Sequence, residues 1–206
     1  MRTSRIRTTR RTGGLALTAA GLALTAACGS SSPGAAAGAS PSHHPMTHPA
    51  AASAAFGSDC GMIPANGMGS MHGMMTDPVV TAAAHNPLLT TLAADIKTAG
   101  LTSALDSMAA ITVFAPSDSA FTHSDMAMVH GAAAIARILK YHVVSGHVST
   151  AQLAAGTPLT TLEGSTLKPA KMGAVYEVNN ADIICGNIHT ANATVYIINK
   201  VLTPAS

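Results

Sequence analysis

Histidine and methionine residues gather in the N-terminal third of the chain, at a density that could support metal chemistry. His43, His44, Met46 and His48 lie within six residues, and a second group follows between positions 62 and 75. Thioether sulfur and imidazole nitrogen together form a ligand set that suits copper, above all Cu(I). A linker biased toward His and Met, or methionines packed as adaptable filler, would give the same composition without a metal. The candidate copper ligands are His43, His44, His48, Met71, His72, Met74 and Met75.

Three cysteines invite two further kinds of chemistry. Cys28 ends the run Leu24-Thr-Ala-Ala-Cys28 and precedes a glycine and several serines, a pattern similar to a bacterial lipobox, in which the cysteine carries the lipid. An ordinary secretory leader cleaved nearby is the alternative. Cys60 and Cys185 remain as an even pair, and in an exported chain pairing is the default. We therefore predict a disulfide between them, with a free Cys60 thiolate acting as a soft copper ligand as the competing interpretation.

Ser117, Ser119 and His142 are the residues that could suggest a hydrolase. Neither serine lies in a G-x-S-x-G elbow, and the Ser117 hydroxyl could cap the helical turn that follows it. The sequence also has no P-loop, no H-E-x-x-H and no paired carboxylates. Asp118 is explained as negative charge in the first turn of a helix. These observations predict a protein that is not an enzyme.

The first 27 residues have the organisation of an export signal. Five arginines among the first eleven residues precede the apolar run Leu15 to Ala27. At thirteen residues, this run is too short to span a bilayer as a helix. We expect residues 1–27 to form a lipoprotein signal peptide, with a twin-arginine signal at Arg10-Arg11 as an alternative.

Residues 28–76 have the composition of a disordered tether. Ser, Gly, Ala, Pro, His and Met dominate without a hydrophobic period, so this segment is expected to bury too little apolar surface to offset its ordering entropy. Loss of the leader removes five arginines and leaves six Lys and Arg against nine Asp and Glu, a formal charge of −3. Because no basic patch is interleaved with aromatic residues, the mature chain is not predicted to bind nucleic acid.

From Asp77 onward, the sequence has the patterns of a folded domain. Apolar residues recur at helical spacing in the stretches 79–85, 88–100, 101–105 and 134–142. The β-branched and aromatic run Ile111 to Phe114 predicts a strand that ends at a corner made by Pro116. Helices first and strands later predict an α+β domain over residues 77–206. Its last third consists of short β-rich runs separated by turn residues, at 159–162, 165–167, 175–178, 183–185 and 194–202.

Three blocks of sequence, in order, carry a resemblance. They are Thr112-Val-Phe-Ala-Pro116 with Ala120-Phe121, then Tyr141-His142-Val-Val-Ser-Gly146, then Asn192-Ala-Thr-Val-Tyr-Ile-Ile-Asn-Lys-Val-Leu-Thr-Pro204. Together they resemble the fasciclin domain, a module of extracellular adhesion proteins, over roughly residues 77–204. With a single domain behind a lipoprotein leader, the chain is similar to the small fasciclin lipoproteins and secreted antigens of actinobacteria. The resemblance implies a compact wedge of two β-sheets with helices packed at one side.

Within that family, the Tyr-His region has been linked to the binding of cell-surface receptors, which the resemblance places at Tyr141 and His142. His142 also continues the apolar stripe of its helix. The alternative is therefore a buried histidine satisfied by a backbone, Asp or Ser partner. Such a residue can still matter for adhesion, because it holds the surface in shape.

The sequence thus predicts an exported lipoprotein, anchored at the outer face of a bacterial membrane or in the cell wall, with an adhesive or binding role. Its expected partners are a cell-surface or extracellular protein or matrix ligand, and the membrane through the lipid; no cofactor is expected. The alternative is an extracytoplasmic copper-binding protein that uses the His- and Met-rich tether. Asn192-Ala-Thr194 has the form of an N-glycosylation acceptor, but we expect any sugar of a bacterial protein on the tether.

Overall fold

A six-stranded mixed sheet is the centre of the fold, with the strand order β2-β1-β8-β7-β6-β5. The computed structural model describes residues 54–122, 124 and 131–204; the leader, Cys28 and the group His43, His44 and His48 lie outside the described residues. The strands of this sheet are β1 (Ile111–Pro116), β2 (Val143–Ser145), β5 (Pro169–Met172), β6 (Val175–Val178), β7 (Ala181–His189) and β8 (Ala193–Ile198). A separate antiparallel pair consists of β3 (Leu159–Thr160) and β4 (Thr166–Leu167).

The two central strands, β1 and β8, are buried along their whole length. They pair in parallel from Ile111 opposite Ala193 to Pro116 opposite Ile198. A near-continuous run of apolar and β-branched residues suits such a position, because both faces of the strand are covered. Alternate residues contribute to two hydrophobic clusters, with Val113 and Val195 in one and Phe114 in the other.

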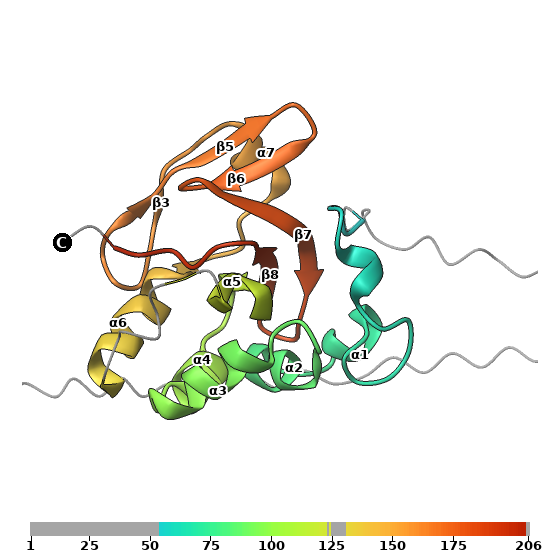
Figure 1. Cartoon of the computed structure of the whole chain (residues 1–206), viewed down its shortest axis with the longest axis vertical. Coiled ribbons are helices and arrows are strands. Elements are labelled where there is room, and N and C mark those ends of the chain that lie inside the picture. The colour runs from blue at the N-terminus through green and yellow to red at the C-terminus, as the bar shows by residue number, and fades with distance from the viewer. Residues whose placement is uncertain (1–53, 123, 125–130, 205–206) are drawn as a thin grey trace, which may run out of the picture. The chain divides into compact units, whose positions relative to one another are not determined.

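Most helices gather on one side of this sheet, while the β5–β6 hairpin and α7 extend at the opposite end of the view (Figure 1). The helix α3 presents Leu92 and Ile96 to the core, four residues apart as the helical period requires. The helices of the domain are α2 (Val79–His85), α3 (Thr90–Thr98), α4 (Thr102–Ser107), α5 (Asp118–Thr122), α6 (Ala132–Tyr141) and α7 (Thr150–Ala154). Among the described residues, no helix is both long and apolar enough to cross a bilayer.

Two helices receive their N-terminal caps from distant side chains. Residue Leu89, at the cap position of α3, offers no side-chain acceptor. Instead, the Asp118 carboxylate accepts from the Thr91 backbone N–H at 2.8 Å and from the Thr90 hydroxyl at 2.6 Å. Burial would raise the pKa of Asp118, but these hydrogen bonds outweigh it and hold that pKa below its usual value. In the same way, Asp106 accepts from the Val80 N–H of α2 at 2.9 Å.

The folded unit begins before Asp77. Residues 54–76, which the sequence analysis assigned to the tether, form a segment that we call the N-terminal hook, with the 3-10 turn η1 (Cys60–Met62) and the short helix α1 (Met71–Met74). Its Phe56 exchanges two backbone hydrogen bonds with Gly186 of β7, at 3.2 and 2.7 Å. At Gly69, a Cβ would lie only 2.1 Å from the His85 carbonyl oxygen. The hook therefore packs backbone against backbone, which a composition-based prediction does not detect.

Each predicted strand overlaps a strand of the structure, but the extents differ, and β2 and β5 were not predicted. β7 is nine residues long, whereas the sequence indicated residues 183–185. Pro169, which lies between two of the predicted runs, begins the edge strand β5, a position that tolerates its missing N–H. Asn179 and Asn180 both have positive φ, +47° and +66°, and form the tight turn between β6 and β7.

Candidate functional site

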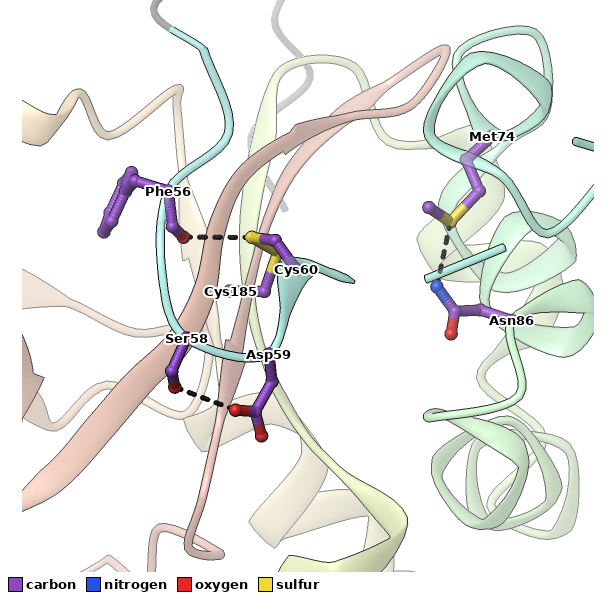
Figure 2. Close-up of a disulfide and its surroundings, with 7 residues drawn as sticks. All are labelled: Phe56, Ser58, Asp59, Cys60, Met74, Asn86 and Cys185. Carbon is purple, nitrogen blue, oxygen red and sulfur yellow. Dashed lines mark hydrogen bonds between the residues drawn. A yellow bond between two sulfur atoms is a disulfide. The ribbon is translucent and has the colours of Figure 1, made fainter. Parts of the chain in front are cut away.

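The structure joins Cys60 and Cys185 in a disulfide, as the cysteine count predicted (Figure 2). The two Cα atoms are 4.9 Å apart, and the bond links residues 125 positions apart. Cys185 is fully buried in β7, and Cys60 belongs to the hook. Because both sulfurs are engaged, Cys60 does not offer the free thiolate that the competing copper interpretation required.

The predicted copper ligands of the hook fall into two groups. Met74 is buried, and its sulfur accepts a hydrogen bond from Asn86 Nδ2 at 3.4 Å (Figure 2). The prediction that Met74 is available as a ligand is therefore wrong, because its thioether packs in the core. His72 and Met75 are exposed and Met71 is half-buried, so these three remain available.

His142 lies in the core and both of its ring nitrogens are engaged by backbone groups. Its Nδ1–H donates to the Ile138 carbonyl oxygen at 2.9 Å, and Nε2 accepts from the Leu202 N–H at 2.9 Å. These contacts fix one neutral tautomer and tie the end of α6 to the C-terminal segment. Burial lowers the pKa of His142 to about 4, although its hydrogen bond to the Ile138 carbonyl favours the charged form.

His142 forms no hydrogen bond with Ser117 or Ser119. The Ser117 hydroxyl lies 2.9 Å from the Ser119 hydroxyl, whereas both nitrogens of His142 are occupied elsewhere. The Ser117 hydroxyl therefore does not make the predicted cap. The backbone carbonyl oxygen of Ser117 accepts a hydrogen bond from the Ala120 N–H instead.

We expect acid to destabilise the domain through His142. Below about pH 6.5 the unfolded imidazole takes up a proton, whereas the native one stays neutral until about pH 4. The unfolded state therefore binds more protons in this window, and the free energy of unfolding falls as the pH falls, by up to about 3 kcal/mol from this residue. Urea unfolding at pH 7, 5.5 and 4.5 measures the loss. In His142→Gln, which is less stable at pH 7, the same profile should be flatter; an equally steep profile would contradict the assignment.

Tyr141 lies beside a groove of about 600 Å³. Its ring is buried, and its hydroxyl accepts a hydrogen bond from Asn179 Nδ2 at 2.8 Å. The Asn179 Oδ1 atom accepts in turn from the Lys168 N–H at 2.8 Å, so the tyrosine and the β6–β7 turn are held together. Burial raises the pKa of Tyr141, which keeps the phenol neutral. The groove is lined by Tyr141, Lys168, Pro169, Ala170, Glu177, Asn179, Asn180, Thr203 and Pro204.

The groove has the mixed chemistry of a recognition surface. Lys168 supplies a positive charge, Glu177 a negative one, and the Tyr141 hydroxyl and Asn180 supply neutral hydrogen-bonding groups. The edge strand β5 forms one border, so its free side also offers backbone groups to an incoming chain. Sequence reasoning indicated Tyr141 through the family resemblance, but it missed the other residues, because they come from three separate segments without a common motif.

Asn192 is engaged inside the domain. Its Nδ2 donates to the carbonyl oxygens of Leu105 and Met108, both at 2.8 Å, and its Oδ1 accepts from the Val79 N–H at 2.9 Å. A sugar on this nitrogen would have to break the contacts to the end of α4. The Asn192-Ala-Thr194 sequence therefore has a structural role in the folded domain.

Comparison with known proteins gives concordant results. The family model described as the fasciclin domain matches residues 87–204. Immunogenic protein MPB70 of Mycobacterium bovis is 38% identical over 171 residues, which cover 77% of this chain and 87% of that protein. Cell surface glycolipoprotein MPB83 of the same species is 40% identical over 147 residues, covering 67% of this chain and 66% of that protein.

A solved structure extends the comparison to the fold. The FAS1 domain pair of the insect cell adhesion molecule fasciclin I matches with a TM-score of 0.54 at 14% identity, over 64% of this chain. The match covers 52% of that pair, so the chain spans about half its length. At this identity, the likeness is one of fold.

Proposed function

Because the chain belongs to the fasciclin domain family, we propose that it is a cell-surface protein that binds or adheres to an extracellular protein or matrix ligand. The groove beside Tyr141 is the observation that carries this proposal. It combines an open volume of about 600 Å³ with opposite charges and a free strand edge, features that suit a polypeptide ligand better than a buried small molecule. His142 supports the groove from within the core and does not touch the ligand.

The proposal includes an anchor at the cell surface. The leader ends in a lipobox-like run at Cys28, and the relative MPB83 is named a cell surface glycolipoprotein. A lipid on Cys28 would hold the chain at the outer face of the membrane, with residues 29–53 between the lipid and the hook. The role is one of binding without catalysis.

Blocking the groove should weaken adhesion. Ala170 is exposed in β5, lines the groove and tolerates a strand-forming aromatic residue, so Ala170→Tyr fills the volume without removing a buried contact. Beads coated with the mature chain should be retained on reconstituted extracellular matrix or on isolated bacterial cell wall. Ala170→Tyr should reduce the apparent affinity at least about tenfold, or about 1.4 kcal/mol.

Thr160→Tyr is the matched control, because Thr160 is an exposed strand residue of β3 outside the groove lining. Equal retention of wild type and Ala170→Tyr, or retention of neither on both surfaces, would refute the groove as the adhesive site.

Replacing the proposed lipid acceptor should release the protein. In a bacterial host that processes lipoproteins, wild type should partition into the detergent phase of a Triton X-114 extract, because an acyl chain adds about 0.8 kcal/mol for each buried CH₂ group. Cys28→Ala should accumulate in the medium or remain unprocessed. Identical partitioning of the two proteins would contradict the anchor.

A further inference from the structure

The hook exposes an unusual amount of sulfur. Five large apolar side chains are exposed in the described part of the chain, and three of them are methionines of the hook: Met62 at 62%, Met68 at 56% and Met75 at 53%. Thioethers normally fill core gaps, as Met74 does here. Their concentration at the surface of one 14-residue segment is therefore not explained by packing.

Helix α1 directs several soft donors to one side. At about 100° per residue, Met71, Met75 and His72 project within an arc of about 100°, and the buried Met74 lies outside it, about 60° beyond Met71. Met75 has helical backbone angles, φ −63° and ψ −23°, so it continues the same face. His72 and Met75 are exposed and Met71 is half-buried. Two thioethers and one imidazole thus share an accessible face.

Met68 lies against Gly73, on the opposite side of the helix from this face. A Cβ on Gly73 would lie 2.7 Å from the Met68 Cα atom, so the turn before α1 is packed directly against the helix. Ser70 fixes this turn: its hydroxyl donates to the Gly67 carbonyl at 2.6 Å, and its oxygen accepts from the Gly73 N–H at 3.0 Å. The disulfide at Cys60 and the core contacts of Met74 then attach the hook to the domain.

We propose that Met71, His72 and Met75 form a binding site for a soft monovalent cation, Cu(I), on the surface of the hook. Two thioethers and an imidazole match the preference of Cu(I) for sulfur and nitrogen ligands. A site for a hard divalent cation is disfavoured, since no group of three or more His, Cys, Asp or Glu residues that could hold a metal lies within the described residues. The site is separate from the groove at Tyr141 and does not depend on the adhesive function.

Methionine methyl NMR tests this assignment residue by residue. The mature full-length chain is labelled with ¹³C at the methionine methyl groups and titrated with Ag(I), a redox-stable probe for the same ligands. The signals of Met71 and Met75 should shift together and saturate at one equivalent. Met172, which is 65% exposed on β5, is the internal control for an isolated surface thioether and should not shift with them.

Competition with a chromophoric Cu(I) chelator then measures affinity. Ascorbate, not a thiol, keeps the copper reduced, so that the disulfide stays intact and Cys60 offers no thiolate. The double variant Met71→Leu, Met75→Leu keeps apolar volume and should weaken binding at the hook at least about tenfold. Replacing His43, His44 and His48 by Asn and Met46 by Leu should leave that equivalent in place.

Three results would overturn the site. They are the absence of Ag(I)-induced shifts in the hook, shifts of Met172 equal to those of the hook, and Cu(I) uptake that disappears only with the residue 43–48 replacements. The first two would leave the exposed methionines as a surface for a protein partner, and the third would move copper binding to the tether.

Discussion

Loss of the disulfide will lower the free energy of unfolding by up to roughly 5 kcal/mol. The bond closes a loop of 125 residues, and the chain-entropy model assigns about this value to such a loop. Residual structure in the unfolded chain reduces the figure. The double variant Cys60→Ala, Cys185→Ala removes the bond without placing a polar group at the fully buried position 185. Urea unfolding of the two proteins measures the difference.

The loss should appear first in the hook. Without the bond, the hook is held by the core contacts of Ile63 and Met74 and by the backbone pairing at Phe56. Hydrogen exchange should therefore accelerate at the amides of Phe56 and Asp59, which donate to Gly186 and Ile184 of β7. A reductant should reproduce the effect in wild type and do nothing to the double variant. An unchanged unfolding midpoint in both would mean that packing alone holds the hook.

The sequence predicted the parts of this fold that local periodicity controls. The spacing of Ile135, Ile138 and Leu139 indicated α6, and the run from Ile111 to Phe114 indicated β1, because both stretches must bury a face. Cysteine counting predicted a bond across 125 residues, since only one pair remained. The periodicity of a helix or strand is visible within a short stretch of sequence, and two remaining cysteines allow only one pairing.

The hook could not be recognised in this way. Its order comes from close backbone contacts at glycine, from the disulfide and from single buried side chains such as Ile63 and Met74. Each is a contact with residues far along the chain, so composition alone indicated a tether. The caps of α2 and α3 are similar, because Asp106 and Asp118 act on helices 26 to 28 positions away.

The sequence also did not distinguish the roles of the residues at the groove beside Tyr141. The Tyr-His pair was visible in the sequence, but its two members differ: Tyr141 lines the groove, and His142 is closed off by Ile138 and Leu202. Adjacent residues at the end of a helix point in different directions. A motif therefore located the region, and the structure separates the residue that lines the groove from the one that supports it.

Substitution of Asn192 will destabilise the domain by about 3 kcal/mol or more. Its side chain connects the N-terminus of α2, the end of α4 and the start of β8, through contacts to Val79, Leu105 and Met108. Asn192→Ala leaves these three backbone groups without their hydrogen-bond partner, and each unsatisfied buried group costs about 1–3 kcal/mol. Thermal and urea unfolding measure the loss.

Asn192→Asp makes the test specific. The variant keeps the size and the Oδ1 acceptor for Val79, but it replaces the donor with a second oxygen that faces the carbonyls of Leu105 and Met108. Repulsion and desolvation should make it at least as destabilising as Asn192→Ala. Asn66→Asp controls for the added charge, since Asn66 is exposed in the hook, and should change stability by less than about 0.5 kcal/mol. If Asn192→Asp were as stable as wild type, the carbonyl contacts would carry no energy, and the sequon asparagine would again be free for another role.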